Sequence, residues 1–348
     1  MDFYVMSGDR VTGTWKDGVF TVVDESLAPM YLVNTGNVSH WLEMRAIDCH
    51  RANSRLLKKA LRLAERDDAG TVISVHAATI TDNYWIKPLD SKLQYSDVRF
   101  DNDYFAELAL RGGYDSFNRA ANSKRTHTPE LTNIGSFEKC WKLRNNEWWM
   151  VKKADHKQQF SEIFICELGK QLGFQMAEYI RGVRSVLTCD FTENGKYNFE
   201  PAYSFMGDDE DCIAVVTKLR AIAPYVIPDY VRLVFVDTIA ANPDRHTFNF
   251  GLLRDAATGE IVSLAPNFDN NMALIARGYP GNLARKKDVL ISCFNELMAF
   301  DLSLKQYVPS LSEEDIRTVL AKVNMRVRSD VVVRFVMSGY AGCCCNLT

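Results

Sequence analysis

The chain has 348 residues, of which 47% are hydrophobic and 24% charged, proportions typical of a folded protein with room for two domains or one bilobal unit. Its formal net charge of -3 at pH 7 gives no overall attraction to nucleic acid or to an anionic membrane. No apolar run approaches the roughly 18 to 20 residues that span a bilayer, and the first residues lack the basic-then-apolar order of a signal peptide. We therefore expect a cytoplasmic protein that binds neither nucleic acid nor membrane directly.

The nine cysteines give no sign of a zinc site. They are scattered singly, apart from the run Cys343, Cys344 and Cys345, and none has the paired spacing of zinc ligands. A reducing compartment explains free, mostly buried thiols. The terminal run could be lipidated or redox active, but because it lacks a prenylation signature we favour a structural or incidental role.

The first segment, residues 1–115, alternates short β-like runs with one basic helical stretch. That stretch, "RANSRLLKKALRLAERDD" at 51–68, places leucines on one broad face and Lys and Arg on the other, as in a helix with a solvated face. The aromatic-rich segment 79–98, interrupted by Pro88, is typical of an irregular packing or docking element. The polar stretch 116–130 has few large apolar residues. We therefore expect an N-terminal accessory region over 1–115, followed by a linker over 116–130.

A β-rich segment over 131–215 and an α-rich segment over 216–348 follow. Two apolar runs flank the turn-forming "RNNE", which predicts a β-hairpin, and "QQFSEIFICELGKQLG" keeps helical spacing up to Gly173. Later, "PDYVRLVFVDTIAA" and "SEEDIRTVLAKVN" predict helices, and "FGLLRDAATGEIVSLAP" predicts a short hairpin between them. This order predicts an α+β, bilobal fold with a β-rich N-lobe, an α-rich C-lobe and a cleft where they join.

The stretch "NPDRHTFNFG" at 242–251 places an acid, an imidazole and an amide directly after an apolar helical run. Asp244 and Asn249 lie on this loop, and "PNFDN" supplies a second acid, Asp269, after the short hairpin. Phosphoryl transfer from a nucleotide needs an acid to orient a hydroxyl, and an amide and a second acid to hold Mg²⁺. The spacing therefore indicates phosphoryl transfer, although Asp244 taken alone could equally cap a helix.

Three upstream features complete this inventory. Lys152 or Lys153 ends a predicted strand, and Glu162 lies in the next helix, where it could form the ion pair that positions nucleotide phosphates. The stretch "TNIGSFEK" at 132–139 predicts a turn whose backbone N–H groups could cover phosphates. Taken alone, Glu162 could be a solvated helix residue and Lys152 a charge at a strand end. Together, the order of loop, Lys, Glu, catalytic Asp, Asn and metal Asp is that of a protein kinase.

At these motifs the chain resembles the HipA-like serine/threonine kinases, a bacterial family with a kinase-like fold that includes toxin kinases of toxin–antitoxin systems. "NPDRHTFNFG" is similar to the family's N-x-D-x-H-x-x-N catalytic loop, and "LAPNFDNNMAL" to its A-P-x-x-D metal motif. "MVKKAD" resembles the V-K-F-P lysine strand, and "SEIFICELGKQLG" the N-E-Y helix. The resemblance covers residues from about 128 to 300. Two departures are a phosphate loop, "TPELTNIGSFEKCWK", shorter than T-S-x-G-G-x-x-P-K, and V-K-K in place of V-K-F.

The resemblance implies a role for each residue of the catalytic loop. Asp244 would be the base or would orient the acceptor hydroxyl, and Asn249 and Asp269 would bind Mg²⁺. His246, also a candidate catalytic residue, is expected to brace the loop by hydrogen bonding rather than to act as the base, because Asp244 has the kinase position. Arg245 could neutralise a phosphate or pair with an acid, and the sequence leaves both roles open.

The resemblance also implies how ATP would be held. Lys152 would contact the α and β phosphates and Glu162 would hold Lys152, with Lys153 as a rival lysine. Ser136 is the candidate for autophosphorylation, since family members can be phosphorylated on a loop serine as a self-inhibiting switch, and a phosphate adds about two negative charges. The residues expected to contact the nucleotide are Asn133, Ile134, Gly135, Ser136, Lys152 and Asp190.

We therefore expect an ATP- and Mg²⁺-dependent kinase acting on Ser or Thr of a protein substrate, with an antitoxin or other regulatory partner implied by the family. A small-molecule kinase of the same fold is a rival, because the motifs do not identify the acceptor. A catalytically silent binding module is a second rival, against which the complete set of Asp244, Asn249 and Asp269 argues. A nuclease or phosphatase with a two-metal site would leave the upstream Lys and Glu unexplained.

Overall fold

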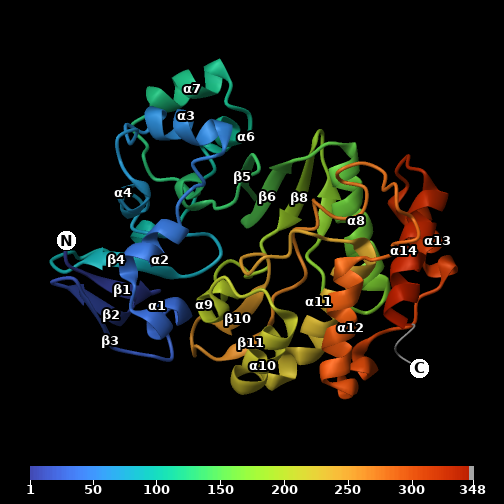
Figure 1. The fold of residues 1–348 in the computed structure, drawn as a ribbon. Coiled ribbons are helices and arrows are strands. Elements are labelled where there is room, and N and C mark those ends of the chain that lie inside the picture. Colours follow the sequence, from blue (N-terminus) through green and yellow to red (C-terminus); the bar gives the residue numbers. More distant parts are fainter. Residues whose placement is uncertain (345–348) are drawn as a thin grey trace. The chain divides into compact units, whose positions relative to one another are not determined.

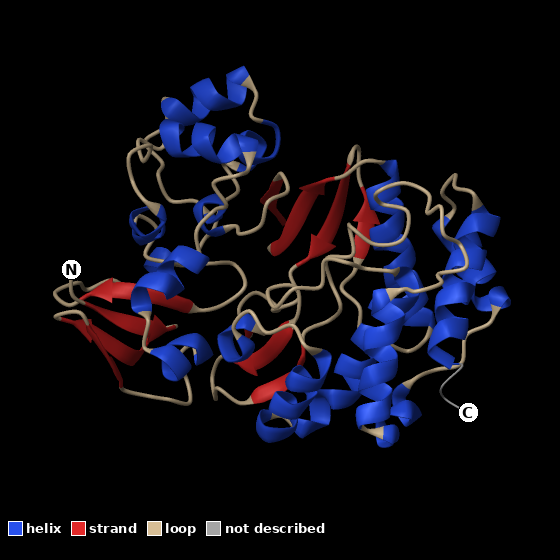
Figure 2. Cartoon of the chain, viewed as in Figure 1, coloured by secondary structure: helices blue, strands red, loops and turns tan. Residues whose placement is uncertain are grey.

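The computed structural model describes residues 1–344, which form helices and antiparallel strands (Figure 1 and Figure 2). The chain divides into two compact units. The first comprises Met1–Lys153, Leu187–Glu200 and Leu253–Val262, and the second comprises Ala154–Val186, Pro201–Leu252 and Ser263–Thr348, of which 345–348 lie outside the described residues. The α+β class with antiparallel sheets confirms the predicted class. The two-lobed arrangement and the boundaries at 115, 130 and 215 stay predictions.

The first unit begins with a four-stranded antiparallel sheet in the order β3-β2-β1-β4. Strand β1 (Phe3–Ser7) lies between β2 (Arg10–Lys16) and β4 (Tyr84–Pro88), and β3 (Val19–Val22) is an edge strand. Strand β4 comes from the segment 79–98, for which we expected irregular structure. The aromatic run "YWIKP" is regular here because all three of its first side chains are buried.

Short helices connect and follow these strands. Helix α3 ends at Ala60, and Arg62 has a left-handed φ of 61°, so the helix predicted over 51–68 is shorter than expected. Helix α7 occupies the first part of the stretch 116–130 for which we expected a linker, and its Ala120 is buried. The helices of this region are α1 (Met30–Thr35), α2 (Val38–Met44), α3 (Ala52–Ala60), α4 (Asp68–Ile73), α5 (Tyr95–Val98), α6 (Ala106–Arg111), α7 (Tyr114–Ala121) and the 3-10 helix η1 (Pro129–Thr132).

The predicted hairpin around "RNNE" is confirmed. Strands β5 (Lys139–Arg144) and β6 (Glu147–Lys153) pair in antiparallel register around Asn145 and Asn146, both of which have the positive φ that a tight hairpin turn requires. In sheet order β8 (Ser185–Cys189) is the neighbour of β6. A separate three-stranded sheet has the order β11-β10-β9. Its strands are β9 (Tyr197–Pro201), β10 (Gly251–Asp255) and β11 (Ile261–Leu264).

One hydrophobic core joins the N-terminal sheet and helices to this hairpin. It contains Met6 of β1, Leu57 of α3 and Phe105 before α6, packed in one cluster with Trp141 of β5 and Trp148 of β6. Full burial of a large apolar side chain stabilises a fold by roughly 1.5–3 kcal/mol. The N-terminal region and the hairpin are therefore stabilised together and do not form separate cores.

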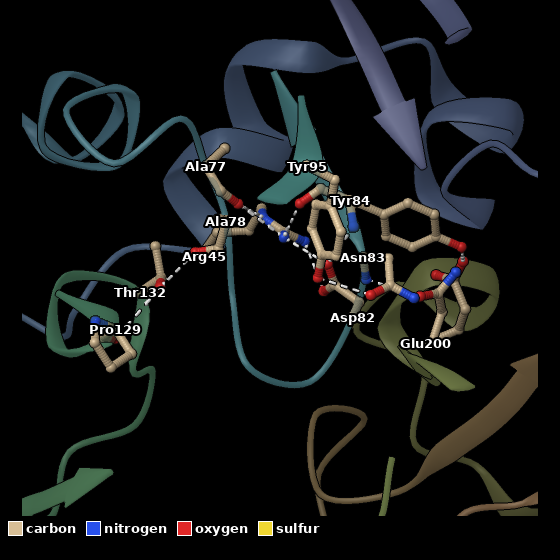
Figure 3. A network of polar contacts seen from close by, with 11 residues as sticks. Arg45, Ala77, Ala78, Asp82, Asn83, Tyr84, Tyr95, Pro129, Thr132 and Glu200 are labelled. Carbon is tan, nitrogen blue, oxygen red and sulfur yellow. Dashed lines mark hydrogen bonds and ion pairs between the residues drawn. The ribbon is translucent and has the colours of Figure 1, made fainter. Parts of the chain in front are cut away.

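A buried polar network ties β4 to distant parts of the same unit. The Tyr84 hydroxyl donates to Glu200 Oε1 at 2.7 Å, as Figure 3 shows, and Arg254 Nη1 donates to the same oxygen at 2.9 Å. Arg254 also donates to the backbone carbonyls of Ala28 and Ser26. Because Glu200 and Arg254 are both almost fully buried, each charge depends on the other for its stability.

The second unit is mostly helical, and helix α11 (Ile227–Ala240) lies at its centre, in contact with α8, α10, α12 and α14 (Figure 1). The helices predicted in "PDYVRLVFVDTIAA", "QQFSEIFICELGKQLG" and "SEEDIRTVLAKVN" are confirmed, the second with an N-terminal capping box at Asp155. The other elements are α8 (His156–Gln171), β7 (Tyr179–Arg181), α9 (Tyr203–Met206), α10 (Cys212–Ile222), η2 (Pro224–Val226), α12 (Val289–Phe300), η3 (Leu302–Tyr307), α13 (Glu313–Val323) and α14 (Ser329–Cys344).

The structure describes only part of the cysteine run at 343–345. Cys343 is a buried residue of α14, whereas Cys345 lies outside the described residues. Among residues 1–344, no helix combines the length and the apolar character needed to cross a membrane.

The Glu200–Arg254 pair gives a direct test of this fold. Glu200→Gln should lower the free energy of unfolding by about 3 kcal/mol, because it leaves the buried Arg254 guanidinium without a counter-charge. The measurement is urea denaturation followed by far-UV circular dichroism. Glu193→Gln, in an exposed pair with Lys196, is the matched control and should leave the midpoint unchanged. Equal midpoints for Glu200→Gln and wild type would show that Glu200 does not stabilise the buried Arg254 charge.

Candidate active site

The loop 242–250 leaves helix α11 through a sharp turn. Ala241 has a left-handed φ of 51°, and the backbone N–H of Asn242 donates to the Asp237 carbonyl at 2.8 Å, which closes the helix. The Asn242 side chain then donates to Asp237 Oδ1 at 2.9 Å and accepts the backbone N–H of Asp244 at 3.2 Å. The first Asn of the motif therefore fixes the direction in which Asp244 leaves the helix.

Hydrogen bonds within the loop fix the spacing between Asp244 and Asn249. The Asn249 Nδ2 group donates to the Asp244 carbonyl at 2.8 Å, and the backbone N–H of Asn249 donates to the His246 carbonyl at 2.8 Å. His246 Nδ1 accepts the backbone N–H of Phe248 at 3.3 Å, a local contact of the bracing kind expected for this residue. The Asp244 carboxylate is only partly buried and makes no hydrogen bond to the described residues.

Arg245 holds the loop to the surrounding structure. Its Nε and Nη2 donate to the two carboxylate oxygens of Asp237 at 2.8 and 3.0 Å, which is the bidentate geometry of a strong ion pair. Its Nη1 donates to the carbonyls of Asn249 and Phe268, both at 2.6 Å. Of the two roles left open by the sequence, Arg245 therefore pairs with an acid, and it joins the loop of Asp244 to that of Asp269.

Electrostatics within this cluster favour the ion pair. Burial is the largest single influence and lowers the pKa of Arg245, but the charge and hydrogen bonds of Asp237, together with the charge of Asp269, outweigh burial and raise this pKa above its usual value. Arg245 Nη2 also donates to the side-chain oxygens of Asn267 and Asn270, at 3.0 and 2.8 Å. The planar guanidinium thus fixes several loop segments at once, which a lysine could not do.

The second loop places Asp269 in a constrained backbone. Asp269 has a left-handed φ of 59°, which is uncommon for a residue other than glycine. Its backbone N–H donates to the Tyr179 hydroxyl at 2.9 Å, and the next backbone N–H, of Asn270, donates to Glu162 Oε2 at 2.8 Å. Burial, together with the charges of Glu162 and Asp269, raises the pKa of Tyr179 well above its usual value. Glu162, which is fully buried in α8, therefore supports the Asp269 loop directly.

The side-chain oxygens of these loops fit a hard divalent cation. Asn249 uses its Nδ2 group on the Asp244 carbonyl, which leaves Oδ1 as the atom that can ligate a metal. Asn271, two residues after Asp269, has a buried Oδ1 with no hydrogen-bond donor among the described residues, and a cation or its bound water would satisfy that oxygen. Carboxylate and amide oxygens are the ligands that Mg²⁺ prefers.

The loop 133–139 belongs to the first unit and leads into β5, whose first residue is Lys139. Gly135 has a φ of 101°, a backbone conformation that favours glycine, and Lys139 Nζ lies beside it, 2.5 Å from where a Cβ would be. The tip residues Ile134, Gly135 and Ser136 are exposed, whereas Asn133 is buried. The predicted loop residues thus form one turn, with Lys139 folded over its glycine.

Two buried lysines face each other in the β5–β6 hairpin. Lys139 and Lys152 are directly paired in the register and are only 8% and 6% exposed. Lys153 is exposed, and this burial favours Lys152 over Lys153 as the lysine of an enclosed site. Because Lys139 and Lys152 are paired, their side chains lie on the same face of the hairpin. The predicted pairing of Lys152 with Glu162 stays a prediction.

Asp190 uses its carboxylate on the turn that follows β8. Its oxygens accept the Thr192 hydroxyl at 2.8 and 2.7 Å and the Thr192 backbone N–H at 3.1 Å. Burial raises the pKa of Asp190, although these hydrogen bonds partly offset that effect. The role of Asp190 as a nucleotide contact stays a prediction.

A buried acid, Glu130, lies in η1 just before the loop 133–139. Its Oε1 accepts the backbone N–H of Trp141 at 2.8 Å and its Oε2 accepts Asn133 Nδ2 at 3.1 Å. Burial raises the pKa of Glu130 to about 7, against the opposing influence of the Trp141 hydrogen bond and the Arg51 charge.

Sequence reasoning missed several of these residues. Asp237 was detectable as the single acid within the apolar run 231–241, since a buried carboxylate requires a cationic partner. Lys139 lay inside the stretch singled out as a phosphate loop, but no role was given to it. Glu130, Arg51 and Asn271 carried no local signal, because their partners become visible only in the folded chain.

Comparison with known proteins gives relatives among kinases. No family model matches the chain. The serine/threonine-protein kinase CtkA of Helicobacter pylori is 30% identical over 152 residues, which cover 36% of this chain and 46% of that protein, so the chain spans less than half the length of this curated relative. The crystal structure of an H. pylori proinflammatory kinase CtkA is 18% identical, covering 59% of this chain and 89% of that one, with a TM-score of 0.44 that is too low to indicate a shared fold.

A second solved structure extends over nearly the whole chain. HipA of Shewanella oneidensis MR-1, in its toxin–antitoxin complex with HipB and operator DNA, is 13% identical, and the match covers 99% of this chain and 97% of that one with a TM-score of 0.51. At this identity the likeness concerns the fold alone. The fold likeness agrees with the kinase-like fold expected from the motifs, and the partial sequence match is to a serine/threonine-protein kinase.

Arg245 can be tested by its closest replacement. Arg245→Lys should lower the free energy of unfolding by about 2–4 kcal/mol, because one ammonium cannot satisfy both Asp237 and the loop carbonyls. Thermal unfolding by calorimetry measures the effect. Arg317→Lys, in an exposed pair with Glu313, is the control and should shift the transition very little. If Arg245→Lys shifts the unfolding transition as little as Arg317→Lys does, the Arg245 guanidinium is dispensable for stability.

Glu130 predicts a specific dependence of stability on pH. Its folded-state pKa of about 7 lies above the ordinary value of 4.5, so the folded protein retains a proton that the unfolded chain releases. The stabilising contribution is therefore complete below about pH 4.5 and is lost as the pH rises through about 7, a change of about 3 kcal/mol.

Glu130→Gln removes this titration and serves as the reference. The free energies of unfolding of wild type and variant, measured in urea at about pH 5 and about pH 8, should diverge, with the wild type losing more stability at the higher pH. All other carboxylates are common to both proteins and cancel in the difference. A difference that is independent of pH would contradict the raised pKa.

Proposed function

We propose that this chain is a HipA-like kinase that transfers the γ-phosphate of ATP to a serine or threonine of a protein. The observation that carries the proposal is the arrangement around Arg245. A single buried guanidinium, paired with Asp237, fixes the loop that presents the Asp244 carboxylate and the loop that carries Asp269. Preorganised acids of this kind are what phosphoryl transfer requires, since its catalysis consists mostly of positioning and electrostatic stabilisation.

Asp244 is the group that meets the acceptor. In the proposed reaction the acceptor oxygen forms a bond to the γ-phosphorus while the bond from that phosphorus to the β–γ bridging oxygen breaks and ADP leaves. The hydroxyl proton passes to the Asp244 carboxylate, which is partly exposed and free of hydrogen bonds to the described residues. The fixed loop supports this role because a general base must lie within hydrogen-bond distance of the proton it accepts.

The metal-binding residues would be Asn249 and Asp269. Asn249 Oδ1 is left available by the hydrogen bond from its Nδ2 group, and Asp269 is held by Tyr179. A bound Mg²⁺ would neutralise the charge that develops on the phosphate oxygens. Glu162 supports the Asp269 loop through Asn270, a role in addition to the ion pair with Lys152 that we propose from the family.

The residues proposed to bind the phosphates lie in the first unit. We assign the α and β phosphates to Lys152, and we add Lys139, which is paired with Lys152 in the hairpin and contacts the loop glycine. The exposed backbone N–H groups around Gly135 would cover the remaining oxygens. Ser136, exposed at the tip, is the proposed site of autophosphorylation, and a phosphate there would repel the nucleotide.

The nature of the acceptor rests on the family rather than on the site geometry. A small-molecule kinase would use the same residues, and phosphate appearing only on a low-molecular-weight acceptor would support that alternative. A regulatory protein of the antitoxin type is a further proposal. The HipA of Shewanella oneidensis is found with such a partner, HipB, in a complex with operator DNA.

Asp244→Asn is the decisive variant. With ATP and Mg²⁺, its rate of phosphate transfer should fall by about 10²- to 10⁴-fold, since the amide cannot accept the hydroxyl proton, while its affinity for Mg·ADP stays unchanged. Intact-mass spectrometry of the same incubations should show one phosphate on wild type that Ser136→Ala and Asp244→Asn both lack. Asp208→Asn, an exposed acid of the second unit, is the control and should retain full activity. An active Asp244→Asn would overturn the role given to Asp244.

A further inference from the structure

Arg51 connects the N-terminal region to the proposed phosphate loop. It immediately precedes helix α3 and is only 2% exposed. Its Nη1 donates to the carbonyl of Asn133 at 2.7 Å, and its Nη2 donates to the carbonyl of Lys139 at 2.5 Å. Asn133 and Lys139 are the first and last residues of the loop 133–139. One rigid guanidinium therefore sets the distance between the two ends of the loop.

Other contacts hold the same two ends. At the start, Asn133 Nδ2 donates to the buried Glu130 carboxylate at 3.1 Å. At the end, the Glu138 carbonyl accepts the backbone N–H of Lys153 at 2.8 Å, and the Glu138 carboxylate accepts the backbone N–H of Asn53 at 3.3 Å. The loop is thus anchored at its ends from residues 51–53 and from the hairpin, while its tip stays exposed.

The segment that leads into the loop is also held by the N-terminal region. The Thr132 hydroxyl donates to the carbonyl of Ala78 at 2.7 Å, as Figure 3 shows, and the backbone N–H of Ile47 donates to the carbonyl of Leu131 at 2.9 Å. Both contacts are buried. They fix the approach of the chain to Asn133, so that Arg51 acts on a segment that is already aligned.

The burial of a charge at Arg51 is costly for stability alone. Its Nε atom is buried without a hydrogen-bond partner among the described residues, and buried charges can often be replaced by apolar side chains of similar volume without loss of stability. An apolar residue could fill this space but could not bridge two carbonyls. The geometry is therefore better explained by positioning of the loop than by stabilisation of the fold.

We infer that Arg51 is a positioning residue for nucleotide binding, through which the N-terminal region fixes the shape of the loop 133–139. The inference rests on the proposed function, since it takes this loop to be the one that covers the phosphates. It gives the N-terminal region a role in the reaction: Arg51 holds the loop ends at the spacing at which the N–H groups around Gly135 converge on one anion.

Two variants test the inference against a matched control. Arg51→Lys keeps the positive charge but cannot bond to both carbonyls. Arg51→Met keeps a similar volume but has neither the charge nor the hydrogen bonds. Arg254→Lys is the control, because Arg254 is a buried guanidinium of the same unit that also bridges two carbonyls but does not contact the loop. The readouts are the KM for ATP, kcat, the melting temperature and hydrogen exchange of the peptide covering 131–141.

Both Arg51 variants should raise the KM for ATP by about tenfold or more, as expected for the loss of hydrogen bonds from a charged group, while kcat changes little. Hydrogen exchange in 131–141 should become faster in both. Arg254→Lys should lower the melting temperature without changing either the KM or the exchange of this peptide. A KM change that merely follows the melting temperature across all three variants would overturn the inference, as would unchanged exchange in the Arg51 variants.

Nucleotide binding by the wild type separates this inference from the proposed function. If wild type binds no nucleotide, the proposed function fails and the positioning role fails with it, whatever the exchange shows. If wild type binds Mg·ATP normally and the Arg51 variants bind it equally well, the proposed function stands and only the role of Arg51 is rejected.

Discussion

The ion pair between Arg245 and Asp237 is the constraint on which the arrangement of the candidate site depends. Asp237 lies on the central helix of the second unit, among side chains that are mostly apolar, and its charge is tolerable only because Arg245 meets it in bidentate geometry. Once the guanidinium is held there, its remaining N–H groups lie where the carbonyls of Asn249 and Phe268 can accept them. The buried core of the unit thereby determines the backbone of both functional loops.

In the candidate site, the residues that hold the loops differ from the residue proposed to react. Arg245, Asp237 and Asn242 are occupied with one another, whereas the Asp244 carboxylate makes no hydrogen bond to the described residues. Glu162 also supports a loop, because its Oε2 accepts the backbone N–H of Asn270. A site whose loops are already fixed by buried partners needs little reorganisation when charge develops in the transition state.

The sequence predicted what is local and missed what depends on distant partners. The loop 242–251 and its helix were predictable, because an apolar helical run followed by closely spaced polar residues is a local pattern. The role of Arg245 could not be decided, since its partners come from several separate segments. Arg51 was hidden in a basic stretch that fits a solvated face equally well, and only the fold shows that it turns inward. The helix there also ended early, at Ala60, where a left-handed residue follows closely.

The hydrophobic core shared by the N-terminal sheet and the β5–β6 hairpin bears on how this chain can be divided. Trp141 and Trp148 belong to the hairpin, yet their packing partners include Met6, Leu57 and Phe105. A fragment begun near residue 128, where the resemblance to kinases starts, would leave both tryptophans facing water and prone to association with other chains. The stretch that carries the motifs is therefore shorter than the stretch that must fold together. The first 115 residues and the hairpin share one hydrophobic core and form a single folding unit.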